Sequence, residues 1–481
     1  MREIIPIQPN LGETNIEDII IDTKSRDDIP DVLMGLQHIF ICTDLKADLF
    51  ALLKSILNDN QLNIGRSGLN MWSVFVLATL RTNLNWDYDR LQHMVNQHIG
   101  IRQMLGKSGL FDDGYHYPLQ TIKDNVKMLT PELLEKINVL LVNAGHKLLN
   151  KQDANSLSGR CDSFVVETNV HFPSDSGQLQ DAMRKALGLT NTAYQSLGLT
   201  DWRQYKHHEK SLKKLLRKIQ KSKKGNAKNK ESRLKDAHQT YINLARKILH
   251  NLEVSFDKIA NHDLESDIRA YLTDAYRQID QIDRRAIKGE VIPASEKVYS
   301  IFERHTEWNN KGKAGGKIEL GVKVCIIEDQ YQFILHHRVM QKEVDSDIAE
   351  LIVKQCQRNF PNFNSCSFDK GFDSADNQTK LSEILDNVVM PKKGKLSKER
   401  QEIEHDEQFI KDRYQHSAVE SAINCLENHG LDKCLDKGIE GFKRYVSIAI
   451  IGRNIQRIGS ILRAKSRAKE ERQKRKLLKA A

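Results

Sequence analysis

The sequence predicts a mixed α/β protein, with an all-helical N-terminal domain before an α/β domain that a long helical segment interrupts. Three observations predict this arrangement. Apolar residues recur at helical spacing through residues 46–149, and a run rich in Val, Phe and Thr begins near residue 160. Strand-like segments return only after residue 317, once a strongly basic helical block has passed. We therefore expect the α/β domain to consist of two separated pieces.

The N-terminal half begins with a segment, residues 1–45, to which the pattern assigns no role. From residue 46 the spacing of Phe50, Leu53 and Ile56 predicts an amphipathic helix, and Asn70 can cap the apolar helix that follows. Short helices joined by tight turns can include a helix-turn-helix that enters a major groove. Most small helical domains do not bind DNA, so a purely structural domain is the alternative for residues 46–149.

The α/β part is predicted from the order of its elements. Without the helical block, the order is strand, strand, strand, helix, strand, helix, strand, helix, helix, which is typical of a ribonuclease H-like domain. Such a domain has a mixed sheet, in which helical crossovers lead from an antiparallel three-stranded meander to two further strands. The predicted strands are 160–172, 317–328, 332–340, 365–369 and 387–390, and the predicted helices are 345–358, 414–428 and 441–463.

The helical block carries Leu212, Leu215, Leu216 and Ile219 at helical spacing, and the rest of that face is Lys and Arg. It is either a solvated helical hairpin that turns at residues 224–226 or an arm that contacts phosphates. The domain boundaries that follow are 1–45, 46–149, 155–180 with 300–462 for the ribonuclease H-like catalytic domain, 181–299 for the basic insertion, and 463–481 for a basic tail that is either a frayed helix or disordered.

Composition narrows the class of protein. The 481 residues include 39% hydrophobic side chains and carry a net charge of +10, which favours a polyanionic partner, although a soluble basic enzyme has the same balance. The seven cysteines are scattered and form no CxxC pair, so we expect reduced, mostly buried thiols. Neither a secretory signal nor an apolar run of about 18 residues is recognisable, which predicts a cytoplasmic protein.

Three acidic residues occur where phosphodiester chemistry would need them. Two Mg²⁺ ions can activate a nucleophile and neutralise the charge that develops on phosphorus, and Mg²⁺ prefers carboxylate oxygens. Asp162 lies inside the apolar strand RCDSFVV, Asp369 ends the short strand SCSFD, and Glu420 lies on the helix HSAVESAINCLE. Each alone could be a turn, cap or solvated charge. The hypothesis depends on all three lying in suitable elements in this order.

The segments around these acids resemble those of bacterial insertion-sequence transposases of the Asp-Asp-Glu (DDE) type. DSFVVETNVHFPSDS, which starts at Asp162, is similar to the first-aspartate motif of that family, and FDKGFDS, around Asp369, resembles the second. HSAVE, which ends at Glu420, resembles the region of the family's glutamate. RHTEW (304–308) with KGK (311–313) resembles a family motif that leads into a strand. The nearest group is that of the transposases grouped as not classified yet.

The resemblance implies a DNA transposase that cuts insertion-sequence ends and joins them to target DNA. It assigns catalysis and the binding of two Mg²⁺ ions, for which Mn²⁺ can substitute, to Asp162, Asp369 and Glu420. It also implies double-stranded terminal-repeat and target DNA as substrates, a dimer or larger assembly at synapsis, and a bacterial, nucleoid-associated protein. Glu427 is the rival to Glu420, because the residues around Glu420 depart from the family pattern. A nuclease that cuts without joining, and a catalytically idle DNA-binding relic, remain alternatives.

Several neighbouring residues receive other roles. We assign Asp175 to turn or insertion chemistry and Asp373 to a helix N-cap, and strand alternation puts Glu167 on the face opposite Asp162. Lys392, Lys393 and Lys395 either contact DNA phosphates or form a solvated loop. The pairs His207–His208 and His336–His337 lack a metal-like partner and are interpreted as ordinary histidines.

Overall fold

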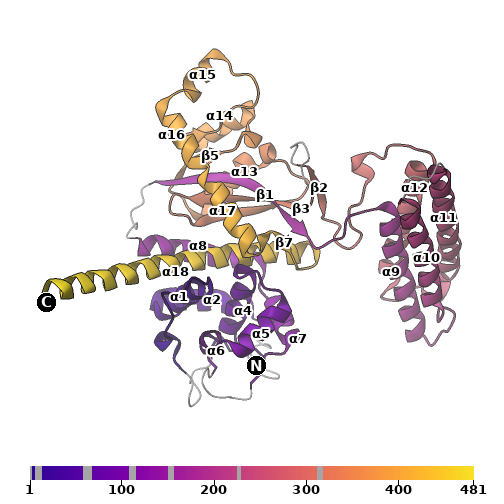
Figure 1. The fold of residues 1–481 in the computed structure, drawn as a ribbon, viewed down its shortest axis with the longest axis horizontal. Coiled ribbons are helices and arrows are strands. Elements are labelled where there is room, and N and C mark those ends of the chain that lie inside the picture. Colours follow the sequence, from indigo (N-terminus) through magenta and orange to yellow (C-terminus); the bar gives the residue numbers. More distant parts are fainter. Residues whose placement is uncertain are drawn as a thin grey trace. The chain divides into compact units, whose positions relative to one another are not determined.

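The computed structural model describes residues 3–5, 14–57, 68–107, 115–149, 156–224, 229–310 and 318–480. The chain divides into two compact units (Figure 1). The first comprises Met1–Asn169 and Asn309–Ala481, and the second is the intervening Val170–Trp308. The predicted turn at 224–226 and the KGK segment at 311–313 fall wholly or partly outside the described residues.

The first unit contains a mixed sheet, so the predicted combination of a helical region and an α/β region is confirmed. Strands β1 (Leu157–Thr168), β3 (Ile318–Asp329) and β4 (Ile334–Met340) form an antiparallel meander. Strands β5 (Phe363–Phe368) and β6 (Asn387–Val389) continue the sheet beside β1 in parallel, reached through helices α13 (Asp345–Asn359) and α14 (Ala375–Ile384). Two short strands that the sequence did not predict, β2 (Glu307–Asn310) and β7 (Lys433–Cys434), also join the sheet.

Both faces of β1 are covered, and its side chains alternate between two cores. Leu157 and Cys161 belong to a core that includes residues of α13 and of α8 (Pro131–Leu148). Phe164 and Val166 belong to another core, which includes residues of α17 (Ala418–Leu426) and α18 (Gly438–Ala480). A strand covered on both faces gives its polar residues a fixed and poorly solvated position, which matters for Asp162.

The helical N-terminal part belongs to the same compact unit as the sheet. The Asn70 side chain caps α4 by accepting a hydrogen bond from the Ser73 backbone N–H, as the sequence predicts. The helices are α1 (Ile29–Ile41), α2 (Thr43–Lys54), α4 (Met71–Asn83), α5 (Tyr88–Gln97), α6 (Ile99–Met104), α7 (Leu119–Val126) and α8.

The long helix α18 joins this helical part to the sheet, since it packs against α1, α4 and α8 as well as against β4 (Figure 1). Its approach to α1 is close. A Cβ atom added at Gly459 would lie 1.8 Å from the Asp31 carbonyl oxygen, and one at Gly35 would lie 2.2 Å from that of Ile455. Only glycine permits backbones to come so near. Helices α2 and α18 each continue across a predicted domain boundary, at residue 45 and at residue 463 respectively.

The basic C-terminal segment is helical, which was one of the two alternatives: α18 continues to Ala480, because its residues are good helix formers and extend a helix already anchored in the core. Two further details differ from the sequence-based expectation. The helix predicted at 414–428 is two helices, α16 (Glu407–His416) and α17, preceded by α15 (Lys398–Glu404). Asp373 is not the N-cap of α14; the Ser374 side chain accepts the capping hydrogen bond from Asn377 N–H.

The second unit is a helical bundle of α9 (Asp175–Ser196), α10 (Tyr205–Ser222), α11 (Lys230–Val254) and α12 (Glu265–Ile282) around its own apolar core. The bundle begins earlier than the predicted insertion at 181, because Ser174 caps α9 through a hydrogen bond from Gly177 N–H. In the described part of the chain, no helix is both long and apolar enough to cross a membrane.

Candidate active site

Asp162 and Asp369 are neighbours because of strand register. Cys161 on β1 pairs with Phe368 on the parallel strand β5, and the two aspartates are the next residue on each strand. Adjacent strands lie about 4.8 Å apart, so the two backbones hold these side chains close together. The Ser163 N–H donates to Asp162 Oδ1 at 2.7 Å, and the Gly371 N–H donates to Asp369 Oδ2 at 3.4 Å. Both carboxylates are therefore oriented by the main chain.

Glu420 comes to this place on a helix that docks on the sheet. Val419 and Leu426 of α17 are buried in the core that β1 shares, and Glu420 lies between them in the first turn, exposed to solvent. The register of α17 on β1 is thus set by apolar side chains, and the carboxylate next to them is left at the margin of the sheet.

The electrostatics show that these acids act on one another. Burial raises the pKa of Asp162 to about 6; the Ser163 N–H opposes that shift, and the charges of Asp369, Asp345 and Glu420 add to it. A carboxylate is harder to ionise when other carboxylates lie near it and water is partly excluded. Asp162, Asp369 and Glu420 form no ion pair with any other residue that the structure describes. The site therefore has an excess of negative charge.

Asp345 is a fourth acid at this site, and sequence reasoning missed it. It is the first residue of α13, where Ser163 Oγ donates to its Oδ1 at 2.6 Å and Lys323 Nζ lies 3.1 Å from its Oδ2. A Cβ atom at Gly371 would lie 3.3 Å from Asp345 Oδ2 and 3.8 Å from Asp369 Oδ2. Asp345 therefore connects the strand of Asp162 with the turn that follows Asp369.

Two cations near the site each pair with an acid. Arg160 pairs with buried Glu328 at 3.1 Å, and Lys323 pairs with Asp345. His416, at the end of α16, shares a hydrogen bond of 3.0 Å with Ser367 Oγ through Nδ1. Burial lowers the pKa of His416, although Asp369 and Glu420 oppose that shift. A neutral imidazole supplies no charge to balance the carboxylates.

The donor set suits a hard divalent cation. Aspartate and glutamate oxygens are the ligands that Mg²⁺ prefers, and a half-buried carboxylate among like charges is stabilised by a bound cation. Within the described ranges, no group of three or more His, Cys, Asp or Glu residues is arranged so that it could hold a metal ion at once. The acids thus gather at one edge of the sheet without converging on a single point.

The remaining predicted residues lie elsewhere or have structural partners. Asp175 pairs with Arg285 at 2.8 Å within the helical bundle. Glu427 starts the helical turn after α17 and is not among the charges that shift the pKa of Asp162, whereas Glu420 is. Burial lowers the pKa values of His336 and His337, and His337 contacts Ser447 Oγ at 3.1 Å. His336 Nδ1 lies 3.7 Å from Glu135 Oε1.

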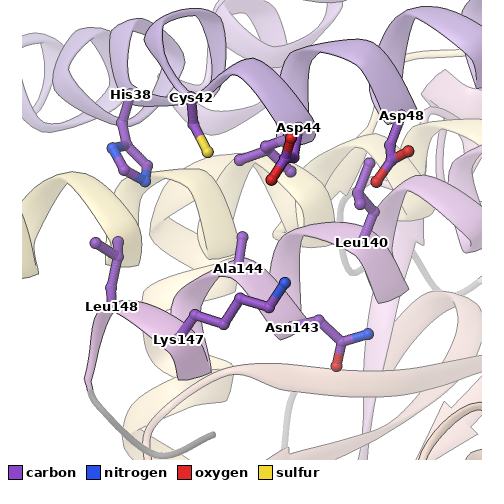
Figure 2. Close-up of a pocket in the computed structure, with 10 residues that line it drawn as sticks. His38, Cys42, Asp44, Asp48, Leu140, Asn143, Ala144, Lys147 and Leu148 are labelled. Atoms are coloured by element: carbon purple, nitrogen blue, oxygen red, sulfur yellow. The ribbon is translucent and has the colours of Figure 1, made fainter.

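A depression on the first unit lies between α1, α2 and α8, with a volume of about 290 Å³. Figure 2 shows His38, Cys42, Asp44 and Lys147 among the side chains around it. Burial lowers the pKa of His38, and Lys465 acts in the same direction. These groups do not form a metal-binding set among the described residues. The depression offers no chemistry comparable to the carboxylates at the sheet.

Comparison with known proteins adds no assignment. No protein-family model, curated protein or solved structure matches the chain. The function must therefore be inferred from the residues and their arrangement.

Proposed function

We propose that the protein is a DNA transposase of the DDE type, which cleaves DNA at the ends of an insertion sequence and joins those ends to target DNA. The observation that carries the proposal is the register of β1 and β5, which makes Asp162 and Asp369 neighbours at a sheet edge that Glu420 also approaches. Sequence motifs that resemble the family surround the same three residues.

The sheet supports this proposal at the level of the fold. Its strand order β4-β3-β1-β5-β6, antiparallel through the meander and parallel beyond it, is the order expected of a ribonuclease H-like domain. In this sheet Asp162 lies on β1, and Asp369 directly follows β5. Along the chain, the bundle is inserted after β1 and before β2 and β3.

Asp162, Asp369 and Glu420 are the residues that would hold Mg²⁺. Two bound Mg²⁺ ions would supply a nucleophile at neutral pH and neutralise charge on phosphorus, and Mn²⁺ could replace them. The chain's own contribution is positional. The main-chain hydrogen bonds to Asp162 and Asp369 orient their oxygens, and burial disfavours an Asp162 carboxylate that lacks a cation.

The substrates under this proposal are double-stranded terminal-repeat DNA and target DNA. The helical region 46–149 and basic surfaces would bind the ends, and synapsis of two ends would require a dimer or larger assembly. A bacterial, nucleoid-associated location follows from such substrates.

The test is a cleavage and strand-transfer assay on DNA that carries the repeats flanking the gene, with Mg²⁺ or Mn²⁺, and with Asp162→Ala beside wild type. Joined products that form only with wild type and metal support the proposal. If wild type cuts but never joins, the protein is a nuclease of the same fold. If it binds the ends and cuts nothing, it is a DNA-binding relic and the metal site is disproved.

A further inference from the structure

The helical bundle carries most of the excess positive charge of the chain. Residues 170–308 contain 26 Lys and Arg against 18 Asp and Glu, whereas the whole chain contains 74 against 64. The remainder of the chain is therefore nearly neutral. Within the bundle the cations concentrate further, since residues 203–224 hold ten Lys and Arg and a single acid, Glu209. All ten of these basic side chains are exposed.

These cations form one stripe along α10. The basic stripe is defined by residues that recur every three or four positions and so lie on one side of a helix: Lys206, Lys210, Lys213, Lys214, Arg217, Lys218 and Lys221. The opposite side of α10 is apolar and fixed in the bundle, with Leu212 and Ile219 buried. At 1.5 Å per residue, the stripe is about 22 Å long.

The stripe is not neutralised by the protein itself. From Lys210 to Lys221, none of its side chains forms an ion pair with a described residue. Other lysines of the bundle do have acidic partners: Lys235 pairs with Glu231, Lys258 with Asp201, and Lys288 with Asp283. The acids of the bundle gather instead on and around α12, where residues 263–283 hold six Asp or Glu. The bundle is therefore electrically asymmetric.

We propose that the basic stripe of α10 binds the phosphate backbone of double-stranded DNA without reading its sequence. This inference rests on the proposed function, which brings DNA to the protein, and adds the surface that holds it. A row of lysines on a rigid helix gains affinity by releasing counterions from a duplex, which carries one charge per about 1.7 Å. Contacts from exposed lysines to phosphates position a protein on the duplex and do not distinguish one base from another.

The chemistry of the stripe favours a duplex over a single strand. Surfaces that bind single strands place aromatic rings between their cations so that bases can stack. Tyr205, His207 and His208 lie in the first turn of α10, and between residues 209 and 224 there is no aromatic residue and no histidine. Over most of the stripe, phosphate is therefore the part of a nucleic acid that this surface is equipped to hold.

The test measures binding of the full-length protein to a fluorescent DNA duplex of unrelated sequence, by anisotropy across a series of salt concentrations. The test variant carries Lys213→Gln, Lys214→Gln and Lys218→Gln, because glutamine keeps the helix propensity of lysine. The control carries Lys235→Gln, Lys258→Gln and Lys288→Gln, which removes the same net charge from the same bundle. Thermal melting of both variants verifies that the bundle remains folded.

The test variant should bind at least about tenfold more weakly in 0.1 M salt, and its slope of log affinity against log salt should fall by about three units. The control should stay within about twofold of wild type. Equal losses in both variants would show that net charge alone matters, and no loss in either would show that the stripe is merely solvated. Tighter binding of wild type to a single-stranded oligonucleotide of equal length would also overturn the assignment.

The outcome can be separated from the fate of the proposed function. Cleavage depends on the acids of the first unit and duplex binding on α10 of the second, so the two readouts are measured separately. If wild type cleaves DNA and the α10 variant binds normally, only the inference about the stripe fails. If the stripe governs binding but wild type never cleaves, the proposed transposase activity fails and the stripe stands.

Discussion

The edge of the sheet and the surface of α10 hold unbalanced charge of opposite sign, and they hold it differently. Asp162 is half-buried, with its position set by strand register and a main-chain hydrogen bond. Lys213 and Lys218 are exposed, and their ammonium groups lie at the ends of flexible side chains. Fixed, poorly solvated charge can act on particular atoms, whereas mobile solvated charge acts as a field. We infer that the sheet edge is built for chemistry and the α10 surface for retention of a polyanion.

The largest expected effect comes from removal of the half-buried charge of Asp162. Asp162→Asn should lower DNA cleavage by on the order of 10³-fold or more, because a residue that acts in a catalytic unit is not replaceable by its neighbours. Duplex binding should be unchanged. The measurement is single-turnover cleavage with Mg²⁺, with anisotropy on the same preparation. Substantial residual cleavage would mean that Asp162 is not part of the reactive site.

The comparison also depends on which helical glutamate belongs to the sheet edge. Glu420→Gln should reduce cleavage nearly as much as Asp162→Asn, because the Glu420 charge is among those that shift the pKa of Asp162. Glu427→Gln is the matched control, seven residues away in the next helical turns, and should retain most activity. The same cleavage assay decides between them. The reverse ranking would move the third acid to Glu427.

A variant of Asp345 tests whether this fourth acid affects metal binding by Asp162, Asp369 and Glu420. Asp345→Asn leaves a side chain of the same shape but weakens the contacts with Ser163 and Lys323. Activity should fall about 10- to 100-fold, with a rise in the Mg²⁺ concentration needed for half-maximal cleavage, as for groups that orient metal ligands. Asp347→Asn, exposed on the same turn of α13, is the control. Equal effects of both changes would remove Asp345 from the site.

Packing of the first unit provides a smaller and purely structural test. Gly459→Ala should lower the free energy of unfolding by about 1–3 kcal/mol, since its Cβ would overlap the Asp31 carbonyl of α1. Gly188→Ala, in α9 of the bundle, meets nothing within 4 Å and should be neutral or slightly stabilising. Thermal denaturation of each variant gives the result. Destabilisation by Gly188→Ala alone would contradict the packing described here.

The smallest effect concerns pH in metal-free protein. Because burial raises the pKa of Asp162 from 3.8 to about 6, the folded state binds this proton more tightly than the unfolded chain. Wild type should therefore lose stability relative to Asp162→Asn as the pH rises from about 4 to 6, with the difference constant above that range. Chemical denaturation in chelator at several pH values measures it, and added Mg²⁺ should restore part of the loss. A pH-independent difference would show that folding does not raise the pKa of Asp162.

Periodicity and element order predicted much of the fold. The run rich in Val, Phe and Thr after residue 160 predicted β1, the apolar stripe from Ile348 predicted α13, and the basic composition located the bundle to within about ten residues of its first boundary. Asp162 and Asp369 could be proposed from sequence because each lies in or directly after a short apolar strand, within a segment that resembles a family motif. These are local patterns combined with the order of the elements.

What the sequence did not predict depends on contacts between distant segments. Nothing local distinguishes Asp345 from any acid in the first turn of a helix; its role emerges when Ser163 and Lys323 meet it across the sheet. The packing of α1 on α18 depends on Gly35 and Gly459, which in a single sequence resemble any helical glycine. The basic end of α18 lacks apolar periodicity, and its helix continues from the anchored part before it.

The most direct test of the central claim uses DNA whose end is already cut and carries a free 3′-hydroxyl, so that only joining is observed. Wild type and Asp369→Ala protein would be incubated with this DNA, target DNA and Mg²⁺, and the joined products counted. The account predicts joined products with wild type and none with Asp369→Ala, although both bind the DNA end. Joining by Asp369→Ala at the wild-type rate would contradict the assignment of the carboxylates at the sheet edge.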